Sequence, residues 1–161
     1  MAERVVRMRL LAAVLVVVTA SYGSGQDASP DDCARTAHMQ VYSNAAFIEE
    51  AGDVVGYELA LDLRKDSTVD AILYVYEGAP NTDGIHLAGR ITGKKLTIEG
   101  NWTEHLIEYP SKKELVQTHF IRMAGMLGSS ALRGTISIEG LVTPAAIRLK
   151  HVEHVWLCRP K

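Results

Sequence analysis

Residues 54–65, VVGYELALDLRK, decide the fold class, because most of their apolar and polar side chains fall on opposite faces of an extended strand. Five apolar side chains would share one face of an extended strand: Val55, Tyr57, Leu59, Leu61 and Leu63. Glu58, Asp62 and Arg64 would share the opposite face. A period of two residues is typical of a β-strand with one buried and one solvated face.

The next apolar segment, AILYVYEG at residues 71–78, has no polar face along most of its length. The two faces would carry Ala71, Leu73 and Val75 on one side and Ile72, Tyr74 and Tyr76 on the other. A strand that is apolar on both sides is typical of a sheet whose two faces are both covered. We therefore expect this strand in the wall of a barrel with part of its exterior shielded.

The same rhythm continues along the chain, with turn residues about every ten positions. Further strand-like segments occupy residues 45–50, 85–91, 96–100, 101–109, 114–123, 131–140 and 145–158. Gly93-Lys94 suits a two-residue hairpin turn. Before them, Ser29-Pro30-Asp31-Asp32 predicts the start of a short helix that ends near residue 38. The expected fold is mainly β: an antiparallel up-and-down meander of about eight strands closed into a small barrel, with a short N-terminal helix.

The first twenty residues have the character of a secretory signal peptide. Arg4, Arg7 and Arg9 precede an apolar run, residues 10–20, that is too short to span a bilayer. The small residues around positions 20 and 25 suit a signal-peptide cleavage site after either residue. We expect a single domain over residues 26–161, exported to the periplasm or the extracellular space, with no stable membrane span after cleavage.

Cys33 and Cys158 are the only cysteines. In an oxidising compartment we expect them to form a disulfide, although a reactive thiol or a metal ligand is the alternative. Chain-entropy arguments give such a long crosslink a stabilisation of about 5 kcal/mol at most.

The charge balance argues against nucleic acid as a partner. Loss of residues 1–20 removes three Arg and one Glu, which takes the formal charge from −2 to −4. The cluster RITGKK at residues 90–95 is a single turn-like cluster and not the basic patch that nucleic-acid binding needs.

The segment HVEHVWLC at residues 151–158 poses a choice between a metal site and a last strand. On a helix, His151 and His154 would share a face and could bind one metal. On a strand they point to opposite sides, and we expect the strand. Histidines of other strands, His86, His105 and His119, could still gather around a metal, but we expect none and predict no cofactor.

No catalytic motif is recognisable, so we expect a protein that is not an enzyme. Ser129 and Ser130 lie in a glycine-containing loop without the nucleophile elbow of a serine hydrolase. An enzyme would need several of His86, His105, His119 and Glu104 in one cleft. Asn101 begins Asn-Trp-Thr, which is an acceptor sequence for N-glycosylation. It would be modified only in a host that glycosylates exported proteins.

Aromatic side chains in several strands are the candidate ligand contacts, because rings with polar tips supply contact area and orientation. The candidate set is Tyr57, Tyr74, Tyr76, Trp102, Tyr109 and Trp156. The alternative is that these rings fill the barrel core, since an eight-stranded barrel has room either for side chains or for one small ligand.

The leader followed by GYELALDL, AILYVYEG and IHLAGRITGKKLTIEG resembles the exported calycin-type barrels, the lipocalin-like and avidin-like proteins. The Gly-x-Trp signature of the first lipocalin strand is missing from AGDVVGYEL. The resemblance implies a barrel fold with a pocket and does not specify a ligand. Export, the meander and the aromatic-bearing strands lead us to expect a module that binds a small apolar ligand. The alternative is a module that binds or inhibits another exported protein through the loops at residues 78–84 and 124–131.

Overall fold

The computed structural model describes residues 30–78, 84–108 and 111–158 of the chain. The expected signal peptide lies outside these residues. The elements are α1 (Pro30–Thr36), β1 (Gln40–Ser43), β2 (Ala46–Ile48), β3 (Asp53–Leu63), β4 (Thr68–Gly78), β5 (Ile85–Thr92), β6 (Lys95–Glu108), β7 (Lys113–Leu127), β8 (Ala131–Ile138), β9 (Val142–Val152) and the 3₁₀ turn η1 (Trp156–Cys158).

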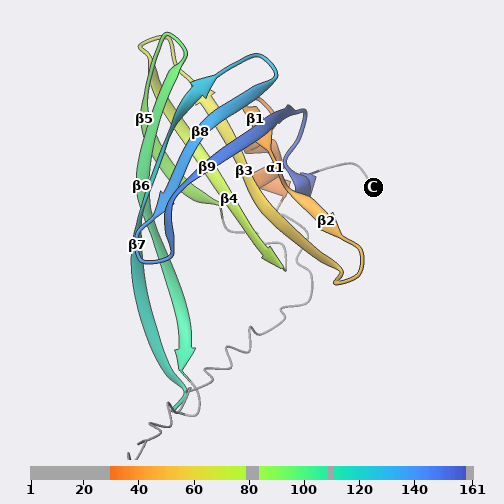
Figure 1. The fold of residues 1–161 in the computed structure, drawn as a ribbon, viewed down its shortest axis with the longest axis vertical. Coiled ribbons are helices and arrows are strands. Elements are labelled where there is room, and N and C mark those ends of the chain that lie inside the picture. Colours follow the sequence, from red (N-terminus) through yellow and green to blue (C-terminus); the bar gives the residue numbers. More distant parts are fainter. Residues whose placement is uncertain (1–29, 79–83, 109–110, 159–161) are drawn as a thin grey trace, which may run out of the picture.

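The sheet closes on itself through β1, as Figure 1 shows. From β3 to β9 each strand pairs antiparallel with the next, and β1 pairs with both β3 and β9. Val41 in β1 lies opposite Ala60 on one side and Val152 on the other. Eight strands therefore form a closed antiparallel barrel, and β2 is an extra strand on β3. The predicted fold class is confirmed.

Two glycines allow sharp changes of direction. Gly93 adopts a positive φ of 61° in the two-residue turn between β5 and β6, as the sequence predicts. Gly56, with φ 118°, lies where β3 exchanges its partner β1 for β2. A Cβ at Gly56 would stand 2.8 Å from the Asn44 side-chain oxygen, which accepts a hydrogen bond from the Tyr57 backbone N–H.

The barrel interior is filled by one apolar side-chain cluster. Its buried members are Tyr42, Leu59, Leu61, Val69, Ala71, Leu73, Val75, Ile85, Leu87, Leu96, Ile98, Ile121, Met123, Leu132, Ile136, Ile138 and Leu149. Truncating a buried leucine to alanine in such a core costs about 2–5 kcal/mol. The interior thus supplies most of the apolar contact that holds the barrel.

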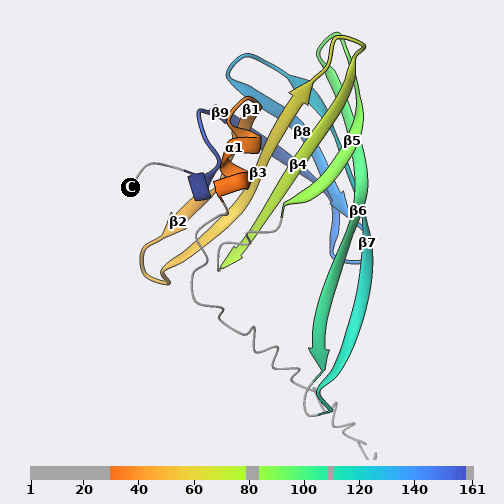
Figure 2. The same cartoon turned by 180° about the vertical axis from the view of Figure 1, so that it is seen from behind.

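A second apolar cluster lies on the outside of the wall formed by β1, β3 and β4. Tyr74 and Tyr76 belong to it and stack at a ring distance of 6.5 Å. Helix α1 and the C-terminal segment lie across this face, and the Cys33–Cys158 disulfide joins them (Figure 2). The covered exterior predicted for residues 71–78 is confirmed, as is the disulfide.

The hairpin of β6 and β7 is longer than the barrel is tall. The two strands pair from Lys95 opposite Met126 to Glu108 opposite Lys113. The pairing with β5 ends at Glu99, and that with β8 begins at Ile121. Residues 101–108 and 113–120 therefore form a two-stranded arm that projects from one end of the barrel, which Figures 1 and 2 both show.

The expectation of a strand through Cys158 was wrong. β9 ends at Val152, and a bend precedes the 3₁₀ turn of Trp156, Leu157 and Cys158. In that turn the Cys158 backbone N–H donates to the Val155 carbonyl. The chain leaves the barrel because its last residues cover the outer cluster instead of extending the sheet.

Candidate functional site

A groove lies between α1 and the outer face of β3 to β6. Its volume is about 490 Å³, a size in the range of small-molecule sites. It is lined by Arg35, His38, Met39, Asp62, Asp70, Ala71, Ile72, His86, Leu87, Ala88, Glu99 and Gly100. Because α1 is joined to the C-terminal segment by the disulfide, one side of the groove is covalently fastened.

The groove has an apolar floor, and Arg35 of α1 supplies a cationic group on the helix side. Ile72 and Ala88 point outward from neighbouring strands, and Met39 follows the helix. The Arg35 guanidinium, which can only donate, lies 3.4 Å from Nε2 of His86. An apolar surface with a few convergent polar groups is the usual composition of a ligand site.

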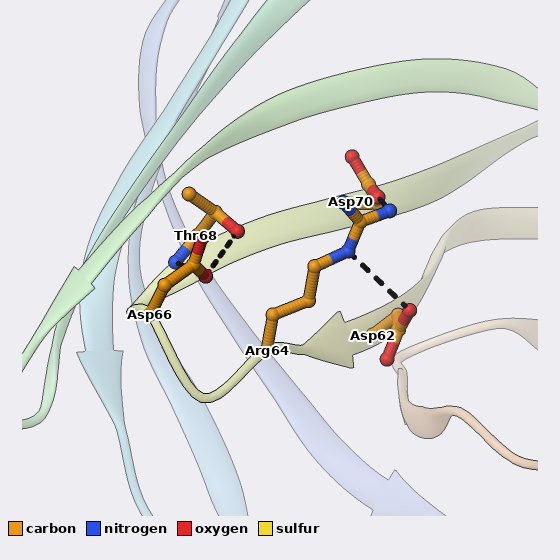
Figure 3. Close-up of polar contacts among 5 residues, drawn as sticks. All are labelled: Asp62, Arg64, Asp66, Thr68 and Asp70. Carbon is orange, nitrogen blue, oxygen red and sulfur yellow. Dashed lines mark hydrogen bonds and ion pairs between the residues drawn. The ribbon is translucent and has the colours of Figure 1, made fainter.

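The opposite rim holds two carboxylates that already have a cationic partner. Figure 3 shows Arg64 reaching both Asp62 and Asp70 from the turn between β3 and β4. In that turn Asp66 accepts hydrogen bonds from the Thr68 hydroxyl and backbone N–H, and these bonds lower the pKa of the Asp66 carboxyl. One guanidinium is therefore shared by two carboxylates, so the rim keeps a net negative charge.

The outer cluster beside the groove contains a buried carboxylate. Glu58 is fully buried, and its Oε2 accepts hydrogen bonds from the Tyr76 hydroxyl at 2.7 Å and from the Trp156 backbone N–H at 2.5 Å. These bonds tie β3, β4 and η1 together. They position the C-terminal segment against the same face that α1 covers.

The aromatic residues predicted to contact a ligand lie on both sides of the wall. Tyr57 and Trp102 pack against the interior cluster. Tyr74, Tyr76 and Trp156 belong to or pack against the outer cluster. Tyr109 lies outside the described residues. The described members of the set therefore do not form one aromatic wall, because neighbouring strands direct their rings to opposite faces.

Tyr42 is a buried residue that the sequence reasoning did not select. Its ring lies inside the barrel, edge-on to His151 at 5.4 Å, and its hydroxyl lies 3.2 Å from both the Gln40 side-chain oxygen and the Gly128 carbonyl. Burial raises the pKa of the Tyr42 phenol. Burial also raises the pKa of Tyr57, with a smaller contribution from the charge of Glu77.

The histidines considered as metal ligands or catalytic groups are also divided. His119 and Glu104 lie on the inner face of the β6–β7 hairpin, with Nε2 3.6 Å from Oε2. His86 and His105 point outward and line, together with Glu104, an open groove of about 560 Å³, in which His105 pairs with Glu114. Within the part of the chain that the structure describes, no three His, Cys, Asp or Glu side chains gather as a metal site.

Comparison of the chain with protein-family models, with curated proteins and with solved structures found no match. The resemblance to calycin-type barrels is supported only by the fold, which is a closed eight-stranded antiparallel barrel. In residues 30–78, 84–108 and 111–158, no helix has the length and apolar character needed to cross a membrane.

Proposed function

We propose that this protein is an exported, non-enzymatic binding module that holds a small apolar ligand in the groove beneath α1. The observation that carries the proposal is the groove itself, about 490 Å³ with an apolar floor and a fastened helix as one side. The filled interior supports the choice of the groove over the barrel lumen. Export is supported by the leader-like residues 1–20 and by the disulfide, which oxidising compartments favour.

The non-enzymatic part of the proposal is supported by the way in which the candidate catalytic groups are paired. His86, His105 and Glu104 line one open groove, but His105 pairs with Glu114 and Glu104 pairs with His119. General acid–base catalysis needs its groups within hydrogen-bond reach of one reacting centre. Among the described residues, no hydrogen bond or ion pair joins His86 or His105 to the pair of His119 and Glu104.

Filling the groove tests the proposal. Ala88 lies on the groove floor, so Ala88→Trp should occupy the ligand volume. Ala146 is equally exposed on the outer face of β9, and Ala146→Trp is the matched control. Native mass spectrometry of protein from its own host should find a small-molecule adduct in the parent and in Ala146→Trp, but not in Ala88→Trp. An adduct retained in both variants, or none in the parent, contradicts the proposal.

A second candidate function, docking to another exported protein, is favoured by the β6–β7 arm. Ile107 and Val116 are 57% and 59% exposed on its outer face, beyond the last strand that could cover them. Free edges of a two-stranded ribbon can also accept a partner strand.

A photo-crosslinker placed at position 107 in the native host tests this docking. It should capture one defined exported protein, and Val116→Ser should abolish the capture. The same crosslinker at Phe47, which is 51% exposed in β2, is the control. Equal capture from both positions contradicts specific docking through the arm.

A further inference from the structure

The outer face of β6 to β9 brings together cations from distant parts of the chain. Lys95 lies opposite Met126, Met126 opposite Arg133, and Arg133 opposite Arg148. All four side chains are exposed. We define these four residues as the basic strip. Over three interstrand spacings of about 4.8 Å, it extends about 14 Å across the barrel wall.

The basic strip contains no carboxylate that would neutralise its positive charges. Arg133 and Arg148 are direct cross-strand partners, an arrangement of like charges that destabilises a sheet. Among the described residues, no carboxylate forms an ion pair with Lys95, Arg133 or Arg148.

The surroundings of the strip do not neutralise it either. The next residues on the same face, one alternation further along each strand, are uncharged: Thr97, Ala124, Thr135 and Ala146. On the other side Lys150 adds a further cation two residues after Arg148. By contrast, Arg122 on the same wall faces Glu99 at 3.4 Å. The unpaired charges are therefore confined to one end of this wall.

We infer that the basic strip binds a linear acidic polysaccharide laid across the strands. Arginine guanidinium groups match carboxylate and sulfate geometry with paired hydrogen bonds, and a polyanion would remove the repulsion between Arg133 and Arg148. The choice of a polysaccharide rests on the proposed export, because such polymers occur outside the cytoplasm.

The strip lacks the features that other polyanions require. None of its residues or their same-face neighbours is aromatic, so it offers no platform on which nucleic-acid bases could stack. Met126 is its only apolar side chain, 55% exposed, and one methionine is a small wedge for a bilayer.

The test compares alginate, a polyuronate, and heparin, a sulfated polymer, with neutral dextran. The parent should bind at least one of the two acidic polymers and not dextran. Removing two charge-assisted contacts in Arg133→Gln/Arg148→Gln should weaken binding about tenfold or more. The salt dependence of log K should also become shallower by about one for each cation removed. Lys112→Gln/Lys113→Gln at the tip of the arm, with the same loss of two positive charges at a distant site, should bind as the parent does.

Equal affinity of the double variant and the parent would overturn the inference. Tighter binding to oligothymidine or to phosphatidylglycerol vesicles than to both acidic polysaccharides would overturn the assignment of the occupant. The variants leave the groove beneath α1 intact, so a failure here is distinguishable from a failure of the small-ligand proposal.

Discussion

The Glu58 carboxylate accepts a hydrogen bond from the backbone N–H of Trp156, 98 residues later in the chain. This contact joins the barrel wall to the segment that leaves the barrel after β9. Together with the Cys33–Cys158 bond, it holds the C-terminal turn over the outer cluster.

Glu58→Gln should lower the free energy of unfolding by about 1–3 kcal/mol, because the amide is a weaker acceptor for the Tyr76 and Trp156 donors and buries an amide NH₂ group. Urea denaturation measures the change. Glu99→Gln removes an exposed pair with Arg122 and should change stability by less than about 0.5 kcal/mol. Equal effects of the two substitutions would show that the buried contact does not stabilise the fold.

Replacing both cysteines, Cys33→Ala with Cys158→Ala, should lower the free energy of unfolding by about 2–5 kcal/mol, since the bond closes a loop with a sequence separation of 125 residues. Urea denaturation of the double variant and the oxidised parent measures this loss. The barrel should remain folded, because its interior cluster does not involve either sulfur. Loss of the β-sheet circular dichroism signal in the variant would contradict that independence.

Stability should fall at alkaline pH through Tyr42. Burial raises the pKa of its phenol in the folded chain above the 10.0 of an unperturbed tyrosine. A raised folded pKa gives stability that is fully present below the unfolded pKa and is lost as the pH rises through the folded value. Tyr42 and Tyr57 should both titrate late in tyrosinate absorbance, and Tyr42→Phe should remove one of these two late steps. An unchanged titration curve would mean that Tyr42 is not one of the late-titrating tyrosines.

Arg148→Gln should leave the protein as stable as the parent or raise its free energy of unfolding by a few tenths of a kcal/mol at low salt, because it removes the charge opposite Arg133. Added salt should reduce the difference by screening. Arg122→Gln, which breaks the pair with Glu99, should give no such gain. Destabilisation by Arg148→Gln would mean that Arg148 has a favourable partner.

The alternation of side chains was sufficient to predict the fold class. Residues 54–65 and 71–78 each divided their side chains between two faces, and the structure follows that division. The solvated face expected for residues 54–65 is wrong at Glu58 and Ala60, which are buried because the outer cluster covers them. The short helix and the turn at Gly93 also follow from local chemistry. The disulfide followed from the cysteine count and the leader, independently of strand pairing.

The sites could not be read from the same pattern, because they depend on which strands are neighbours. The two-residue period predicts that Tyr57 and Tyr74 lie in strands. It does not show that the Tyr57 ring faces the core and the Tyr74 ring faces the exterior. The basic strip could not be predicted from the sequence for the same reason, because only the pairing of β7 and β8 places Lys95 and Arg148 on one row across the sheet. Strand β9 ends early because tertiary contacts of Trp156 override a local strand propensity.

Closure of the wall through β1 is the arrangement on which the groove, the outer cluster and the basic strip all depend. Nuclear Overhauser contacts from the backbone of Val41 measure it most directly, because Val41 lies opposite both Ala60 and Val152. The account predicts cross-strand contacts from Val41 to both residues in the same sample. Contacts to only one of them would mean an open sheet and would contradict the barrel.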